Sequence, residues 1–408
     1  MSGLPSFLLP IRPAPARTGP VIRAFHEEVK DFFTDKPSFR HIKNLSPGMT
    51  AQPILLSEHG EDGSLRRKLV VKVPINRIYD DDLRTERQWL DALRGSPHII
   101  AALNIDVSGL RRPVLVMEYA ARGDLAGLVD RLQNEQGGPV IPNRMMWRFF
   151  LCLTRAVVAM AYPRIGINPV AGFWENGIGR ETIPASGVTP SRLQHWDMHL
   201  GNVFVGDVNR IDREHELSPL LKLSDFGDGA LAMVDAVIGE RIGIANNLAD
   251  VGVVMLCLSQ KMQYDDYSNS RSSAYYTYLD PSVGADKTIL TLANDDFANA
   301  PIMPALKGLL FRCMAFKAAD RPMLPEVLQA CEDAVQNLTQ ADFAPTQDDG
   351  GASESDDTLR AFVRKFLHDA DDEEDTDRRK RLRSSTRSWR VAPNIPPNIP
   401  PGAVTAPF

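Results

Sequence analysis

The sequence predicts an α+β fold in which β-strands come first and α-helices follow. Between residues 40 and 119, short apolar runs separated by turn-forming residues indicate strands arranged around one helix. Further along, residues 144–161, 304–316 and 325–338 are predicted to form buried or closing helices. A hydrophobic content of 43% and a charged content of 24% are ordinary for a globular chain. Strands in one part and helices in the other are typical of the α+β class.

Two short stretches carry the residue types that phosphoryl transfer requires. The first, His195–Asn202, reads HWDMHLGN and places Asp197 five residues before Asn202. The second, Leu221–Gly227, is an apolar alternation that predicts a strand and ends with Asp225 before Phe-Gly. One carboxylate can accept the proton of an attacking hydroxyl, while a carboxamide and a second carboxylate can hold Mg²⁺ against a triphosphate. We therefore assign Asp197 as candidate base, with Asn202 and Asp225 as candidate metal ligands.

These two stretches, about two dozen residues apart, resemble the catalytic loop and the DFG segment of protein kinases. The resemblance implies ATP and Mg²⁺ as cofactors. It also implies a two-lobed fold, with a small antiparallel β-sheet lobe carrying one helix and a second, mainly helical lobe. The smaller lobe and hinge would cover residues 40–120 and the larger lobe residues 121–338. Composition adds an N-terminal extension at 1–39, a surface insertion at 163–191 and a disordered tail at 339–408.

A lysine and a glutamate are candidates for positioning the phosphates. Lys72 lies in an apolar strand that resembles the VAIK strand of kinases, and a lysine there is costly unless its ammonium finds a partner. The resemblance implies that Lys72 contacts the α- and β-phosphates and pairs with a helix glutamate. Glu86 is the best candidate because Leu83, Glu86 and Leu90 share a helical face. The alternatives are an exposed Lys72 on an edge strand and a solvated Glu86.

Further candidate ATP contacts lie in two loops. Residues 45–53 occupy the place of the Gly-rich phosphate loop but retain only Gly48 of its three glycines. Nucleotide affinity could therefore be weak, or neighbouring residues could rebuild the loop. The resemblance implies a hinge whose backbone from Glu118 to Ala120 binds adenine, followed by Asp124 near the ribose. Asp124 is also an ordinary N-cap for the next helix, and both roles can hold at once.

The segment that follows Asp225 departs from the kinase pattern. Residues 228–246 contain no Ser, Thr or Tyr, and Trp196 replaces the arginine that meets an activation-loop phosphate in many kinases. The two departures agree, so we expect activity that does not depend on phosphorylation of this segment. Asn247 stands where the family has Asp, which favours a non-catalytic scaffold. Arg321 lacks its usual glutamate partner, and Glu240 is a possible substitute.

His199 leaves the class of substrate open. It stands where most Ser/Thr kinases have lysine, and the loop is closer to that of aminoglycoside and choline kinases. A neutral histidine still donates one hydrogen bond to a phosphate, so we include His199 among the catalytic candidates and prefer that role to metal ligation. The preferred function is a divergent Ser/Thr protein kinase. The alternatives are a pseudokinase scaffold that binds nucleotide weakly or not at all, and a small-molecule kinase.

Both flanks of the predicted domain contain amphipathic segments. Phe25, Val29 and Phe33 recur at helical spacing and predict a short helix that docks on the core or remains a free stub. In the tail, an apolar stripe over 359–367 could bind the groove of a partner protein or fold back. Residues 378–383 are strongly basic, which fits a nuclear localisation signal or a solvated stretch paired with the preceding acidic run.

Composition also bears on partners and compartment. A net charge of −6 gives no reason to expect specific nucleic-acid binding. The four cysteines have no CxxC spacing, so we expect core thiols in a reducing compartment rather than metal ligands or disulfides. The longest apolar run, Val251–Leu258, is too short to span a membrane, and prolines break the N-terminal segment too often for a signal peptide. These features favour a cytoplasmic or nuclear protein without a membrane partner.

Overall fold

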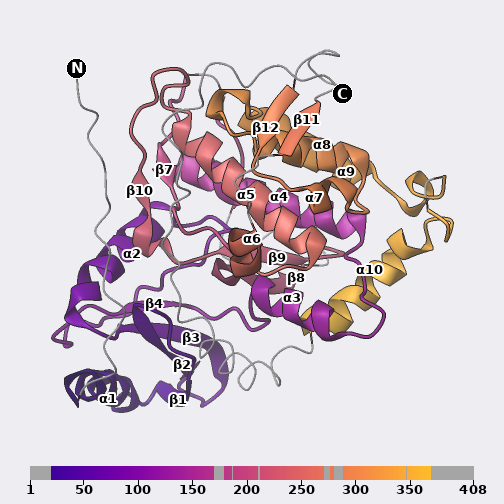
Figure 1. Cartoon of the computed structure of the whole chain (residues 1–408). Helices are drawn as coiled ribbons and strands as arrows, with labels where there is room; N and C mark the ends of the chain where they lie inside the picture. The colour runs from indigo at the N-terminus through magenta and orange to yellow at the C-terminus, as the bar shows by residue number, and fades with distance from the viewer. Residues whose placement is uncertain are drawn as a thin grey trace.

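The computed structural model describes residues 20–169, 179–185, 187–209, 212–270, 276–279, 288–345 and 347–368. These residues form a smaller lobe built on a four-stranded sheet and a larger lobe built mainly of helices (Figure 1). The predicted α+β class with an antiparallel sheet lobe and a helical lobe is therefore confirmed.

The smaller lobe is an antiparallel sheet in the order β1-β2-β3-β4. Its strands are β1 (Phe39–Asn44), β2 (Ala51–His59), β3 (Leu65–Pro74) and β4 (Leu115–Glu118). Side chains alternate between the two faces, so Leu56 and Val71 join one apolar cluster while Leu55 and Val70 join another. Because both faces of this sheet are apolar, each needs a cover of its own.

Two helices belong to this lobe, α1 (Pro20–Thr34) and α2 (Asp80–Ala92), and a 3₁₀ turn precedes α2 at Arg77–Tyr79. Helix α1 buries Phe25, Val29 and Phe33 in the cluster that contains one face of the sheet. Leu83 and Leu90 of α2 belong to the cluster that contains the other face. Of the two interpretations of the N-terminal helix, docking is thus the one that the structure adopts, and residues 20–34 are part of the lobe.

The larger lobe is a helical assembly around two central helices. Its helices are α3 (Leu125–Asn134), α4 (Asn143–Ala161), α5 (Ile242–Gln260), α6 (Tyr264–Ser270), α7 (Asp295–Asn299), α8 (Pro304–Cys313), α9 (Leu324–Asn337) and α10 (Asp356–Val363). Every residue of α4 is buried, and α4 packs against both α5 and α9. The helices predicted at 144–161, 304–316 and 325–338 are present as α4, α8 and α9, although α8 already ends at Cys313.

Short antiparallel ladders lie between these helices. They pair β5 (Ile167–Pro169) with β6 (Gly179–Glu181), β7 (Leu193–Gln194) with β10 (Ala230–Leu231), β8 (Val203–Val208) with β9 (Pro219–Leu223), and β11 (Tyr276–Leu279) with β12 (Thr288–Thr291). Strand β9 is the one predicted before Asp225. One 3₁₀ turn, Leu200–Asn202, lies in the loop after β7, and another, Phe226–Asp228, lies in the loop after β9.

Helix α5 is long and apolar enough to cross a membrane by length and composition. It runs over 19 residues, whereas the sequence suggested a run of only Val251–Leu258. Most of the helix is buried inside the larger lobe, where it packs against α4 and α8. A core helix passes the same test of length and composition, so α5 by itself is weak evidence for a membrane span.

The chain beyond residue 339 departs from its prediction. We predicted a disordered tail from there on, but α10 and a π-helical turn at Arg364–His368 lie beside α3 (Figure 1). Leu359, Phe362 and Leu367 are buried in the main core. The prediction of disorder is therefore wrong for the described residues up to 368. Of the two outcomes considered for the apolar stripe, the structure adopts the one in which it folds back onto this lobe. Residues 369–408, including the basic run at 378–383, lie outside the described residues, as do residues 1–19.

The predicted surface insertion at 163–191 also needs correction. Its strand β6 ends at Glu181, which is fully buried. The Glu181 carboxylate accepts hydrogen bonds from the backbone N–H of His98 at 3.0 Å and from His98 Nδ1 at 2.8 Å. Arg155 donates to the carbonyl of Glu181. Composition rich in Gly and Pro indicated a loop, but it could not show that Glu181 of this loop is buried, with its carboxylate bonded to His98 and its carbonyl to Arg155.

Candidate active site

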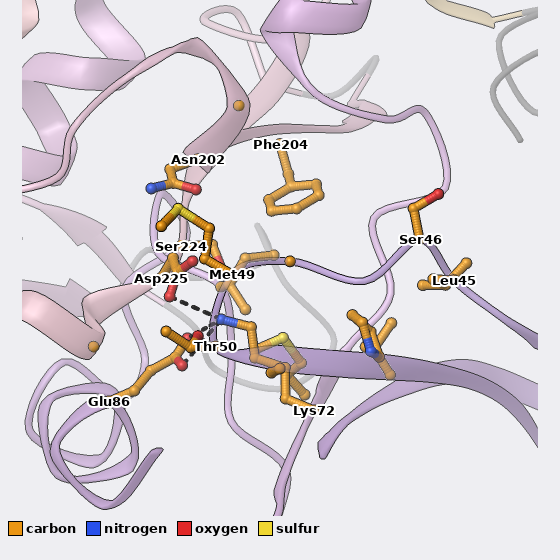
Figure 2. A pocket seen from close by; sticks show the side chains of 18 of the residues that line it. Leu45, Ser46, Met49, Thr50, Lys72, Glu86, Asn202, Phe204, Ser224 and Asp225 are labelled. Atoms are coloured by element: carbon orange, nitrogen blue, oxygen red, sulfur yellow. Dashed lines mark hydrogen bonds and ion pairs between the residues drawn. The ribbon is translucent and has the colours of Figure 1, made fainter. Parts of the chain in front are cut away.

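A cavity of about 340 Å³ lies between the two lobes. Its lining contains nearly every residue that the sequence assigned to catalysis, metal or ATP: Gly48, Lys72, Glu86, Glu118, Ala120, Asp197, His199, Asn202 and Asp225. Asp124 is the exception, although its neighbour Gly123 lines the cavity. The volume falls in the ordinary range of small-molecule sites, which are roughly 300–1,000 Å³. Figure 2 shows how side chains from both lobes converge on it.

An ion-paired cluster forms the inner wall of the cavity. Lys72 Nζ lies 2.8 and 3.0 Å from the two carboxylate oxygens of Glu86 and 3.0 Å from Oδ1 of Asp225 (Figure 2). On β3, Val71 and Val73 point to the face covered by α1, so Lys72 between them points to the cavity. The side chains of Lys72 and Glu86 are only 14% and 2% exposed, which excludes the surface positions considered for both.

The cluster contains one cation and two anions, and this imbalance sets its titration. Burial alone would lower the pKa of the Lys72 ammonium, but Asp225 and Glu86 raise it above its ordinary value. Burial raises the pKa of Glu86 against the opposing charge of Lys72. Burial would also raise the pKa of Asp225, yet Lys72 brings it below its ordinary value. With both carboxylates ionised, the cluster has an excess negative charge that a further cation would neutralise.

The turn that presents Asp225 is unusual in its backbone. Asp225 has a φ of 67°, in the left-handed region that residues other than glycine seldom adopt. The next residue, Phe226, is fully buried, and its ring meets the ring of His195 edge-on at 4.6 Å. His195 Nε2 in turn lies 2.9 Å from the carbonyl oxygen of Ser224. These contacts on both sides of Asp225 hold it in the strained conformation.

Asn202 holds the candidate base in place. Its Nδ2 donates to the backbone oxygen of Asp197 at 2.9 Å and to the carboxylate Oδ2 at 3.1 Å. This leaves the amide oxygen Oδ1 as the atom of Asn202 suited to a cation. Asp197 and Asn202 are thus a coupled pair on one loop, as their five-residue spacing predicted.

Asn247 on α5 is hydrogen-bonded to the backbone just before Asp197. Its Oδ1 accepts a hydrogen bond from the backbone N–H of His195 at 3.1 Å, and its Nδ2 donates to the carbonyl of Leu193 at 2.8 Å. Asn247 is buried in α5, so these bonds are shielded from water. The amide that replaces the acid thus anchors the loop through both of its polar atoms.

His199 is turned toward the base. Its Nδ1 accepts a hydrogen bond from the N–H of Gly201 at 3.1 Å, so the proton of the neutral ring is on Nε2, which lies 3.7 Å from Oδ2 of Asp197. Burial alone would lower the pKa of His199, but the nearby carboxylates of Asp197, Asp225 and Asp124 raise it. His199 therefore lies beside the candidate base with its donor directed at Asp197, and the predicted hydrogen bond from His199 to a phosphate stays a prediction.

The loop before β2 is closed by its own backbone. The N–H of Gly48 donates to the carbonyl of Ala51 at 2.9 Å, so this donor, predicted to face a phosphate, is used within a turn. A Cβ on Gly48 would meet that carbonyl at an ordinary 3.6 Å. The side chains of Met49 and Thr50 line the cavity beside Lys72 (Figure 2). In this state the loop covers the cavity with side chains.

The hinge residues Glu118, Tyr119 and Ala120 line the cavity. The side chain of Glu118 is engaged elsewhere, because its Oε1 accepts from the N–H of Ala101 at 2.8 Å and from Lys222 Nζ at 2.7 Å. Any contact of Glu118 with adenine would therefore use its main chain. Asp124 Oδ1 accepts the N–H of Gly127 at 2.8 Å, so the predicted N-cap of α3 is present. Its contact with a ribose stays a prediction.

Two further residues complete the surroundings of the site. Trp89 on α2 donates from Nε1 to the carbonyl of Gly229 at 2.8 Å and so ties the helix of Glu86 to the segment after Asp225. We did not predict this contact, although Trp89 lies one helical turn beyond Glu86 in the sequence. Glu240 pairs with Arg192 at 2.8 Å, so the structure does not use it as the partner proposed for Arg321.

Of the comparisons with known proteins, the one with solved structures found matches. No family model and no curated protein matches the chain. Among solved structures, a chain of the CAK complex from Chaetomium thermophilum bound to ATP-γ-S is similar over 76% of this chain and 94% of that chain, with 17% sequence identity and a TM-score of 0.48. At that similarity, activity has to be argued from the side chains of the site.

Proposed function

We propose that this chain is an ATP- and Mg²⁺-dependent phosphotransferase, a divergent protein kinase that acts on Ser or Thr hydroxyls. The observation that carries the proposal is the Lys72 ammonium, which is ion-paired to both Glu86 and Asp225 in the cavity that also contains Asp197. Desolvating these charges is costly, and a buried ion pair is weak evidence for stability alone. A fixed ammonium beside a polar cavity is suited to holding phosphate oxygens.

Asp197 is the proposed base. The two hydrogen bonds from Asn202 fix its backbone and carboxylate at the edge of the cavity. From there the carboxylate would accept the proton of a substrate hydroxyl as the oxygen attacks the terminal phosphorus of ATP. His199 Nε2, at 3.7 Å, would orient the same carboxylate.

The residues present fit a magnesium ion. Mg²⁺ prefers oxygen ligands, and the Asn202 amide oxygen and the Asp225 carboxylate supply them in the lining of one cavity. When bound, the ion would neutralise charge on the triphosphate. The excess negative charge around Lys72 favours a cation at Asp225, because only one of its carboxylate oxygens is paired with Lys72.

The second candidate is a pseudokinase scaffold. The turn that uses the Gly48 N–H, together with the Met49 side chain in the cavity lining, favours weak nucleotide binding. A small-molecule kinase remains the third, supported by His199 in place of lysine. The three candidate functions share the same residues around the cavity. They differ in whether Asp197 acts as a base and in which hydroxyl it would deprotonate.

The test is a comparison of four full-length proteins: wild type, Asp197→Ala, Lys72→Met and Asp81→Asn. Asp81 is the matched control, because its side chain is 90% exposed on α2 and forms a surface ion pair with the neighbouring Arg84. Transfer of labelled phosphate from ATP is measured on a generic basic protein and on a panel of small alcohols and amino sugars. Nucleotide affinity is measured separately by titration.

We expect Asp197→Ala to lower kcat by about 10²–10⁴-fold while ATP affinity stays within a few-fold. Lys72→Met should weaken both affinity and turnover, and Asp81→Asn should resemble wild type. Transfer only to small alcohols would support the small-molecule kinase instead. Absence of any Asp197-dependent transfer at saturating ATP, with the fold intact, would refute the phosphotransferase and support the scaffold.

A further inference from the structure

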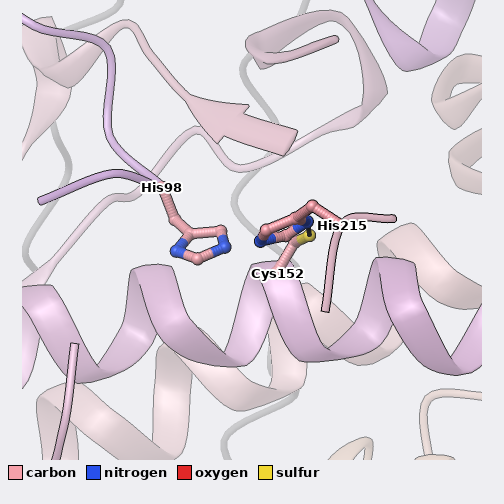
Figure 3. A group of neighbouring side chains, drawn as sticks. All are labelled: His98, Cys152 and His215. Atoms are coloured by element: carbon pink, nitrogen blue, oxygen red, sulfur yellow. Dashed lines mark hydrogen bonds between the residues drawn. The ribbon is translucent and has the colours of Figure 1, made fainter. Parts of the chain in front are cut away.

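A second cluster of polar side chains lies away from the cavity, in the core where the lobes join. His98 follows α2, Cys152 lies in the middle of α4, and His215 lies in the loop between β8 and β9. All three are at most 2% exposed. One nitrogen of each histidine and the cysteine sulfur lie within 4.8 Å of one another. Figure 3 shows the two rings facing each other with the sulfur beside His215.

The orientation of His98 is fixed by a carboxylate. Its Nδ1 lies 2.8 Å from Oε2 of Glu181, and its backbone N–H donates to Oε1 of the same residue at 3.0 Å. The other ring nitrogen, Nε2, is buried and has no hydrogen-bond partner among the described residues. A buried nitrogen without a partner costs about 1–3 kcal/mol. A carboxylate on one nitrogen and an open second nitrogen is the arrangement in which metal-bound histidines are usually held.

His215 and Cys152 supply the other two donors. Nδ1 of His215 lies 4.0 Å from Sγ of Cys152. The second nitrogen, Nε2, lies 3.9 Å from Oδ2 of Asp212, which is beyond hydrogen-bond distance. Asp212 is itself held, because its Oδ1 accepts from the N–H of Glu214 at 3.0 Å and from Arg180 at 3.1 Å. A hydrogen bond to an acid thus orients His98, whereas Asp212 stands near His215 without a hydrogen bond to its ring.

We propose that His98, Cys152 and His215 bind one Zn²⁺ ion. Two imidazoles and a thiolate suit zinc, whereas Mg²⁺ and Ca²⁺ prefer oxygen ligands. Binding forms one Zn–S and two Zn–N bonds and releases the thiol proton to water. A water molecule would take the fourth position of a tetrahedral site.

A metal here would join three distant parts of the chain. The segment after His98 is bonded to β9, since Leu223 donates to the carbonyl of His98 and Ile100 to that of Leu223, both at 2.9 Å. Strand β9 leads directly to Asp225, and α2, which carries Glu86, precedes His98. The zinc would therefore fix the junction that sets Glu86 and Asp225 relative to each other, independently of whether the cavity is catalytic.

The experiment uses the full-length protein expressed with added zinc and dialysed extensively. Metal content is measured by mass spectrometry, and Co²⁺ is then exchanged into the site and its absorption recorded, because a Co²⁺–thiolate bond gives a characteristic charge-transfer band. Cys152→Ser removes only the sulfur donor. Cys257→Ser is the matched control, since Cys257 is equally buried but lies in α5. Glu181→Gln tests the carboxylate behind His98.

We expect one zinc per chain and a cobalt–thiolate band in wild type and in Cys257→Ser. Cys152→Ser should lose the band, and Glu181→Gln should bind zinc about 10–100-fold more weakly. Wild-type protein that contains no zinc and shows no thiolate band would overturn the proposal, whatever happens to the variants. Equal zinc in wild type and folded Cys152→Ser would overturn it too.

Discussion

We predict that Glu354, in the segment that docks beside α3, contributes strongly to the stability of the fold. This residue lies just before α10 and is 1% exposed. Its Oε1 accepts from the backbone N–H of Asn143 at 2.7 Å and from Asn143 Nδ2 at 2.9 Å, while its Oε2 accepts from the N–H of Arg144 at 2.9 Å. The tail thereby caps the N-terminus of α4, a helix whose own preceding residue, Pro142, forms no side-chain cap.

The change Glu354→Gln keeps the shape of the side chain and removes the charge. One acceptor oxygen becomes an NH₂ group, so a buried backbone N–H of α4 faces a donor, which costs about 1–3 kcal/mol. Loss of negative charge at a helix N-terminus adds about 0.3–2 kcal/mol. We therefore expect a loss of about 2–4 kcal/mol in the free energy of unfolding. For a unit the size of the larger lobe, that lowers Tm by roughly 5–15 °C.

The assay is thermal unfolding of the full chain without nucleotide, followed by circular dichroism. Glu326→Gln is the control, because Glu326 is a half-exposed acid on α9 whose ion pair with Arg312 is a surface pair worth about 0–1 kcal/mol. A Tm of Glu354→Gln within 1 °C of that control would refute the reasoning. It would mean that residues 347–367 do not cap α4 in solution.

The remaining predictions concern the site. ATP should raise Tm more with Mg²⁺ than with EDTA, and Asp225→Asn should abolish most of that difference; an equal rise under both conditions would contradict the metal role. Because residues 228–246 carry no hydroxyl side chain, phosphatase treatment should leave the rate of phosphate transfer unchanged; a large loss restored by rephosphorylation within that segment would argue against this. Trp89→Phe removes the hydrogen bond to Gly229 while keeping an aromatic ring, so kcat should fall several-fold with Tm nearly unchanged; a fall in Tm with kcat intact would assign Trp89 to packing alone.

The sequence by itself determined the class of fold and most of the residues around the cavity. Apolar runs of strand or helix length show where strands and helices form. They do so because the spacing of apolar residues within one segment determines which face of that segment can be buried. The same holds for the loop that joins Asp197 and Asn202, whose five-residue spacing brings both side chains onto one turn. Lys72 was also recognisable, since a lysine within a buried strand requires a partner.

Only the tertiary structure decided which side chains share a partner. Lys72 and Asp225 are 153 positions apart, and Glu354 meets Asn143 across 211 positions, so no periodicity in the sequence reports either contact. The cluster of His98, Cys152 and His215 likewise has no motif spacing, because its donors come from separate elements. The polar segment after residue 339 was predicted to be disordered because its partners, too, lie far away in the sequence. Its apolar stripe is buried only once α3 and the rest of the larger lobe are in place to receive it.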